Sequence, residues 1–177
     1  MNWSPIVLCG FMGCGKTTLG PLLARRLGRQ WIDMDEWIVR ETGKTVPELF
    51  AQEGEAAFRA REREACRRLA DRPDCVISAG GGAMTFRENA DCFRRAGFAV
   101  VWLRIPLELA AQRLREDAGR PLARDPEALA RLFAERQPRY AAAATHAVDC
   151  GSDPEENLRR ILTALETPPL PAKEELP

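Results

Sequence analysis

Short apolar runs alternate along this chain with longer segments of helical periodicity. The apolar runs cover residues 5–9, 31–34, 75–79, 99–104 and 146–150. Between the runs, apolar residues recur at helical spacing, and residues 17–27 show this most clearly, with Leu19, Leu22, Leu23 and Leu27. Asp153 and Pro154 open a last helix that runs to about Leu165. This alternation predicts an α/β fold in which helices cover both faces of a parallel sheet.

The length of the chain predicts a single domain. A chain of 177 residues fits one hydrophobic core, and the sequence contains no internal repeat or second domain. We place this domain at residues 1–166. Residues 167–177 carry four prolines and a charged Lys-Glu-Glu cluster, so we expect a disordered C-terminal tail there.

The charge balance indicates that any anion would be bound by a few local residues and not by the overall charge of the protein. The 26 basic and 26 acidic residues cancel, which argues against nucleic-acid or membrane-surface binding carried by bulk charge. No apolar run approaches the roughly 20 residues of a membrane span, and residues 1–5 lack the features of a signal peptide. We therefore expect a cytoplasmic protein. The sequence offers no plausible set of zinc ligands, because its six cysteines are widely scattered and it has a single histidine.

The first apolar run leads directly into a candidate phosphate-binding loop. Residues 10–17 read Gly-Phe-Met-Gly-Cys-Gly-Lys-Thr, which fills the pattern G-x-x-x-x-G-K-[ST] between a strand and a helix. The glycines let backbone N–H groups surround a triphosphate, and the helix that follows adds the positive end of its dipole. Lys16 can reach the β- and γ-phosphates, and the Thr17 hydroxyl can ligate Mg²⁺. The alternative is a glycine-rich turn that binds nothing.

Two carboxylates follow the second apolar run. Asp33 and Asp35 stand at the carboxyl end of the predicted strand, where ligands of such sheets bind, and strand periodicity would place both on one side. Asp33 can hold Mg²⁺ directly or through water, while Asp35 can face the phosphoryl acceptor and take a hydroxyl proton. The alternative is a pair of exposed turn acids.

A run of three glycines follows the third predicted strand. Gly80, Gly81 and Gly82 allow close backbone approach and leave N–H groups to bind an oxygen-rich ligand, although this signal is weak alone. The arginine-rich helical segment at 58–64 would ordinarily be a solvated face with i,i+3 ion pairs such as Arg59 with Glu62, and we keep that interpretation for Arg61, Arg63, Arg67 and Arg68.

Taken together, these motifs resemble the shikimate kinase family from residue 6 to about residue 165. The matching stretches occur in the family's order: the loop at 10–17, Asp33-x-Asp35, Gly54-Glu55-x-x-Phe58-Arg59, Gly80-Gly81-Gly82, Gly119-Arg120-Pro121-Leu122 and Glu135-Arg136-x-Pro138-x-Tyr140. The resemblance implies a three-layer α/β/α P-loop kinase fold with a five-stranded parallel sheet in the order 2-3-1-4-5. It also implies a shikimate-binding segment at about 34–70 and a lid at about 115–126.

The resemblance further implies a reaction and its participants. ATP would phosphorylate the 3-hydroxyl of shikimate, giving shikimate 3-phosphate and ADP on the route to chorismate and the aromatic amino acids. Mg²⁺ would be the cofactor, and shikimate and ATP the partners. We expect a monomer that binds neither nucleic acid nor membranes.

Site residues carry over by position in three groups. Shikimate would be bound by Asp35, Arg59, Gly80, Gly81, Gly82 and Arg136, with Glu62 in support and Phe50 and Phe58 as walls of the pocket. The nucleotide would be bound by Gly13, Cys14, Gly15, Lys16, Thr17, Thr18, Arg113, Arg120 and Pro154. The catalytic residues would be Lys16, Asp35 and Arg120, with Arg120 closing from the lid, and the metal ligands would be Thr17 and Asp33.

Two departures and two alternative functions accompany this interpretation. Cys14 replaces a serine common in the family, and Ser152 or Gly151 stands where some relatives place a basic residue beside adenine. The alternatives are another small-molecule P-loop kinase, acting on gluconate or a nucleoside monophosphate, and a non-catalytic phosphate-binding module. The combination of Asp35, Arg59 and Arg136 with the three glycines favours shikimate kinase.

Overall fold

A computed structural model describes residues 3–116 and 125–170 of the chain. Five parallel strands form one sheet in the order β2-β3-β1-β4-β5, which confirms the fold that the resemblance implies. The strands are β1 (Ile6–Cys9), β2 (Gln30–Asp33), β3 (Cys75–Ser78), β4 (Ala99–Arg104) and β5 (His146–Asp149). Every residue of the central strands β1 and β3 is buried, as expected for a parallel sheet covered on both faces.

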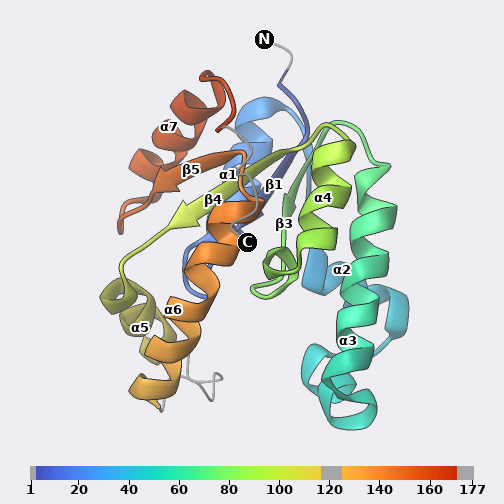
Figure 1. The fold of residues 1–177 in the computed structure, drawn as a ribbon. Helices are drawn as coiled ribbons and strands as arrows, with labels where there is room; N and C mark the ends of the chain where they lie inside the picture. Colours follow the sequence, from blue (N-terminus) through green and yellow to red (C-terminus); the bar gives the residue numbers. More distant parts are fainter. Residues whose placement is uncertain (1–2, 117–124, 171–177) are drawn as a thin grey trace, which may run out of the picture.

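Helices cover both faces of this sheet (Figure 1). Helices α1 and α7 pack together on one face, while α4 and α6 pack against β4 on the other, with α3 alongside α4 and α2 between β2 and α3. The bounds are α1 (Lys16–Leu27), α2 (Met34–Thr42), α3 (Val46–Ala70), η1 (Ala83–Thr85), α4 (Arg87–Arg95), α5 (Leu107–Glu116), α6 (Pro126–Ala143) and α7 (Pro154–Leu165). The expected helices at 17–27 and from Pro154 to Leu165 are therefore present.

The second strand ends one residue earlier than predicted. The Asp33 carboxylate accepts the N–H groups of Asp35 at 3.0 Å and Glu36 at 3.2 Å, so it caps a helix that begins at Met34. Asp35 lies in the first turn of α2, and the expectation that strand alternation aligns Asp33 with Asp35 is wrong. The helix, and not the strand, directs Asp35.

Helix α1 approaches the sheet closely at Gly20. A Cβ atom at Gly20 would lie 2.4 Å from Trp31 Nε1 and 2.5 Å from Ser78 Oγ. These two groups are bonded to one another at 3.0 Å, and Ser78 Oγ also donates to the carbonyl of Lys16 at 2.9 Å. The missing side chain thus lets β2 and β3 hold the first turn of α1, directly after the phosphate-binding loop.

Replacing Gly20 with alanine should therefore destabilise the protein. Alanine normally stabilises a helix interior relative to glycine by about 1 kcal/mol, but overpacking a filled site costs about 1–3 kcal/mol. We expect a fall in Tm of several degrees in thermal unfolding. Gly151→Ala is the control, because apart from its chain neighbours no atom lies within 4 Å of its added Cβ. An unchanged or higher Tm for Gly20→Ala would contradict this packing.

The first residues of the predicted C-terminal tail contact β5 and the residue before it. The Leu170 N–H donates to the Thr145 carbonyl at 2.7 Å, and His146 Nε2 lies 3.3 Å from the Thr167 carbonyl. Residues 171–177, the remainder of that predicted tail, lie outside the described residues.

Candidate active site

A cleft of about 640 Å³ opens at the carboxyl ends of the strands. Its walls come from the phosphate-binding loop, the start of α2, helix α3 and the glycine run after β3, with Arg113, Arg136 and the start of α7 completing them. The position agrees with the rule that ligands of open parallel sheets bind outside the carboxyl ends of the strands. The cleft therefore brings together segments that are far apart in the sequence.

The phosphate-binding loop folds around its own lysine. Lys16 Nζ donates to the carbonyls of Gly10 at 2.9 Å and Phe11 at 3.2 Å, and it lies 3.4 Å from Cys14 Sγ. Gly15 caps α1 with φ of 102°, a conformation that favours glycine, and its carbonyl accepts the Leu19 N–H at 2.8 Å. The helix N-terminus therefore opens into the cleft with a cation beside it, which is an arrangement suited to phosphate.

Arg113 joins this loop to the loop after β5. Its guanidinium donates to the carbonyls of Gly13 and Gly151, each at 2.8 Å. The buried amide of Asn157 holds Gly151 from the other side, accepting its N–H at 2.8 Å and donating to its carbonyl at 3.0 Å. Pro154, at the start of α7, lines the cleft beside them. This network fixes the two loops at the end of the cleft that the sequence assigns to the nucleotide.

At the opposite end, the carboxylates of Asp35 and Glu62 converge on Gly80. A Cβ at Gly80 would lie 2.6 Å from Asp35 Oδ1 and 3.0 Å from Glu62 Oε1, so the backbone approaches both carboxylates closely. Glu62 is 1% exposed. Burial raises the pKa of Glu62, Arg59 lowers it, and the charge of Asp35 raises it further. Asp35 and Glu62 line the cleft, whereas Gly80, which the sequence also assigned to the site, is not among its lining residues.

Arg59 is aimed into the cleft by two acids and two aromatic rings. Its guanidinium donates to Glu62 Oε2 at 2.6 Å and to Glu55 Oε1 at 3.0 Å, and it lies 5.5 Å from the ring centroid of Phe86 and 5.7 Å from that of Phe58. A Cβ at Gly82 would approach Arg59 to 2.7 Å. The predicted ion pair between Arg59 and Glu62 is therefore present, and it lies against the glycine run, where both side chains line the cleft.

Arg136 and Tyr140 hold the middle of the glycine run from α6. Arg136 donates to the Gly81 carbonyl at 3.3 Å, and the fully buried Tyr140 hydroxyl donates to the same oxygen. Burial raises the pKa of Tyr140, so its hydroxyl stays protonated and donates to this carbonyl oxygen. The Gly81 carbonyl thus accepts from two side chains of α6, and both Gly81 and Arg136 line the cleft.

The cleft contains nearly every described residue that the sequence singled out. Gly13, Cys14, Gly15, Lys16, Thr17, Thr18, Asp33, Asp35, Arg59, Gly81, Gly82, Arg113, Arg136 and Pro154 all line it, as do the expected walls Phe50 and Phe58. Arg120 and most of the expected lid lie outside the described residues. Tyr140 and Asn157 carry structural roles that the sequence analysis did not assign. Tyr140 follows Arg136 by one helical turn, which is a usable signal, whereas Asn157 acts only on backbone atoms and gives none.

Thr17 and Asp33 have the chemistry that Mg²⁺ on a nucleotide requires. Both line the cleft, one with a hydroxyl and the other with a carboxylate. Within residues 3–116 and 125–170, no group of three or more His, Cys, Asp and Glu side chains is arranged to hold a metal ion by itself. Among the helices of the described chain, none has the length and apolar character needed to cross a membrane.

Known proteins are similar to this chain in both sequence and fold. The family model for shikimate kinase matches residues 12–166. Shikimate kinase of Geobacter metallireducens is 42% identical over 164 residues, covering 91% of each chain, and that of Halorhodospira halophila is 43% identical over 170 residues, covering 94% of this chain and 96% of the other.

Solved structures agree with the sequence comparison. A shikimate kinase from Acinetobacter baumannii in complex with shikimate superposes with a TM-score of 0.84 at 37% identity, covering 91% of this chain and 92% of the other. A gluconokinase from Sinorhizobium meliloti 1021, at 24% identity and a TM-score of 0.61, shares the fold alone. The matched family model, the identity over nearly the whole chain and the shared fold together show that this chain belongs to the shikimate kinase family.

Proposed function

We propose that this chain transfers the γ-phosphoryl group of ATP to the 3-hydroxyl of shikimate in the cleft described above. ATP-dependent phosphorylation of an alcohol acceptor is the activity of the family. The main observation in favour of this proposal is that the two ends of the cleft differ in chemistry. A phosphate-binding loop forms one end, and two arginines, two carboxylates and part of a glycine run form the other. Such a cleft suits one polyphosphate and one small hydroxylated carboxylate.

The phosphate end supports binding of the nucleotide. Backbone N–H groups of residues 13–18 would surround the β- and γ-phosphates, and Lys16 would exchange its loop carbonyls for phosphoryl oxygens. Adenine would lie between Arg113 and Pro154, which both line the cleft at that end. Arg120, from the segment outside the described residues, is proposed on the sequence resemblance to add a second cation to the transferring phosphoryl group.

The other end supports binding of shikimate. Planar guanidinium groups at Arg59 and Arg136 suit a carboxylate, because two parallel N–H groups match its two oxygens. Gly81 and Gly82 expose backbone to the cleft, and Phe50 and Phe58 provide an apolar wall for a carbon ring. Gluconate is also a hydroxylated carboxylate, but it is an open chain without a ring to lie against the two phenylalanines.

The transfer itself requires alignment more than covalent chemistry by the protein. The acceptor oxygen forms a bond to the γ-phosphorus while the bond to the bridging oxygen of ADP breaks. Asp35 accepts a hydrogen bond from the acceptor hydroxyl. This bond orients the hydroxyl oxygen for in-line attack and places the carboxylate to take the hydroxyl proton. Thr17 and Asp33, the latter directly or through water, would hold Mg²⁺, which would neutralise phosphate charge when bound. Lys16 stabilises the same oxygens from the loop.

A coupled assay of ADP release with the full chain tests this proposal. Shikimate should stimulate turnover of Mg·ATP, whereas gluconate and AMP at the same concentration should leave ADP release at its background rate, because neither presents a ringed carboxylate to Arg59 and Arg136. Mass spectrometry of the product should show one added phosphoryl group on shikimate. Equal stimulation by gluconate or AMP would overturn the substrate assignment, and no stimulation by any of the three would favour a non-catalytic module.

A further inference from the structure

Helix α3 is interrupted inside the proposed shikimate-binding segment. Gly54 has φ of 81° and ψ of 172°, so α3 consists of two helical parts, residues 46–53 and 55–70. Each part contributes one aromatic wall to the cleft, Phe50 from the first and Phe58 from the second, with ring centroids 4.6 Å apart. The position of one wall relative to the other therefore depends on what holds the two parts together across Gly54.

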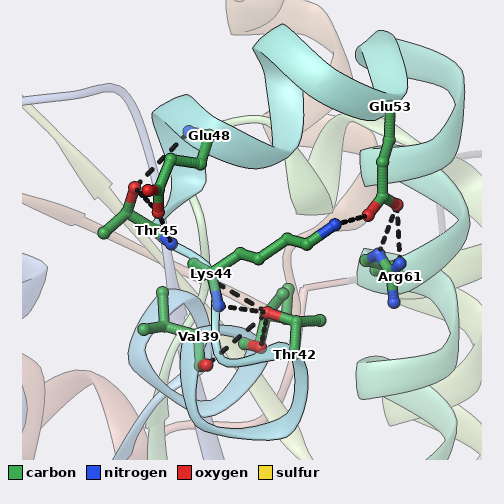
Figure 2. Close-up of polar contacts among 8 residues, drawn as sticks. Val39, Thr42, Lys44, Thr45, Glu48, Glu53 and Arg61 are labelled. Carbon is green, nitrogen blue, oxygen red and sulfur yellow. Dashed lines mark hydrogen bonds and ion pairs between the residues drawn. The ribbon is translucent and has the colours of Figure 1, made fainter.

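Glu53, the last residue before the interruption, contacts side chains on both sides of it. Its Oε1 accepts from Lys44 Nζ at 2.8 Å, and its Oε2 accepts from Arg61 at 2.6 Å and 3.2 Å. Figure 2 shows Lys44 extended beneath the first part of α3 toward the Glu53 carboxylate, with the Arg61 guanidinium on the carboxylate's other side. One carboxylate thus joins the α2–α3 connection to the second part of α3.

The charged form of Glu53 is the one that these contacts favour. Hydrogen bonds from Lys44 and Arg61 lower the pKa of Glu53, so the carboxylate is ionised at neutral pH. Glu53 itself does not line the cleft. Any effect of Glu53 on substrate must therefore act through the residues that do, and Phe50 lies three positions before it on the same helical part.

We propose that Glu53 is a positioning residue for shikimate. By joining Lys44 to Arg61 across Gly54, it holds Phe50 against Phe58 and so keeps these two walls of the cleft at the separation that shikimate requires. The inference rests on the proposed function, because it assigns Glu53 to the substrate that this end of the cleft binds. It predicts an effect on shikimate and none on ATP, since Lys44, Glu53 and Arg61 all lie away from the phosphate-binding loop.

The effect should be moderate. The side chains of Lys44 and Arg61 are 39% and 40% exposed, and partly exposed ion pairs contribute little to overall stability. Their effect on the position of Phe50 should be larger than their effect on stability. A small backbone rotation at Gly54 would move the first part of α3, and Phe50 with it, relative to Phe58. We therefore expect about a fivefold change in shikimate affinity.

Glu48 provides a matched control in the same helical part. Its carboxylate accepts the N–H and hydroxyl of Thr45, each at 2.7 Å, in a capping box, and these contacts lower the pKa of Glu48 just as partners do for Glu53 (Figure 2). All of these contacts lie before the interruption. Glu48→Gln therefore weakens the start of α3 without releasing one part from the other.

The experiment compares steady-state kinetics and shikimate binding of the full chain with those of Glu53→Gln and Glu48→Gln. For Glu53→Gln we expect the KM for shikimate to rise about fivefold, with kcat at saturating shikimate and the KM for ATP unchanged within twofold. Glu53→Asp, which keeps the charge, should recover most of the affinity. Glu48→Gln should lower Tm but leave the KM for shikimate within twofold of wild type.

A second pair of variants keeps the proposal testable if Glu53→Gln folds poorly. Arg61→Gln removes the partner of Glu53 in the second part of α3. Arg61 does not line the cleft, and its replacement should raise the KM for shikimate as Glu53→Gln does. In the double variant the two effects should not add, because both remove the same connection. The proposal is overturned if Glu53→Gln and Arg61→Gln both leave the KM for shikimate unchanged, or if Glu48→Gln raises it equally. Absence of shikimate turnover in the wild-type chain would instead reject the proposed function.

Discussion

Asp35→Asn is expected to lower kcat for shikimate phosphorylation by about 10³-fold, within the range of about 10²–10⁴ that a positioned acid or base contributes. Asparagine has nearly the shape of aspartate, but its amide carries no negative charge and cannot take the acceptor's proton. Asp35 lies in the first turn of α2, where the Asp33 cap fixes the backbone, so the fold should be retained. Single-turnover kinetics with saturating ATP and shikimate measures the effect on the transfer step.

The neighbouring acid Glu36 provides the control for Asp35. It occupies the same helical turn, is exposed and pairs with Arg40 at 3.5 Å, away from the cleft. Glu36→Gln should leave kcat within twofold of wild type. Nucleotide binding measured by calorimetry should be the same for wild type and both variants. If Asp35→Asn turned over within tenfold of wild type, Asp35 would have no part in activating or orienting the acceptor hydroxyl.

Lys16→Met is expected to lower kcat/KM for ATP by about 10²–10³-fold. The methionine side chain has similar length but cannot stabilise charge on the transferring phosphoryl group, and removing one such donor from a phosphate or oxyanion site costs about this much. Lys16 donates to the carbonyls of Gly10 and Phe11, so its ammonium group lies inside the loop.

Lys44→Met is the matched control for Lys16, because the chain has only three lysines and Lys44 lies in the α2–α3 connection. It should leave kcat/KM for ATP unchanged, while the positioning role of Glu53 predicts a weaker affinity for shikimate. The two lysine variants thus separate the two ends of the cleft in one set of measurements. A kcat/KM for ATP within tenfold of wild type in Lys16→Met would remove Lys16 from the phosphate site.

Local patterns predicted the order of the elements because strand burial and helical periodicity are properties of short segments. The run at 99–104 matches β4 residue for residue, and Pro154 begins α7 as the Asp-Pro pair predicted. The error at the end of β2 arose from a competition between two local preferences. Asp33 can continue a strand or cap a helix, and a period-two pattern does not register the two N–H groups that its carboxylate receives.

The sequence by itself determined the phosphate-binding loop, the class of fold and, through the order of its motifs, the family. These depend on residues close together in the chain, such as the glycines and Lys16 of one loop. Only the tertiary structure decided how the shikimate end is built: that Arg59 lies against Gly82 and Phe86, that Tyr140 fixes Gly81, and that Glu53 spans the interruption at Gly54. Each of these contacts depends on distances set by how α3 and α6 pack around the sheet, and no local spacing encodes such distances.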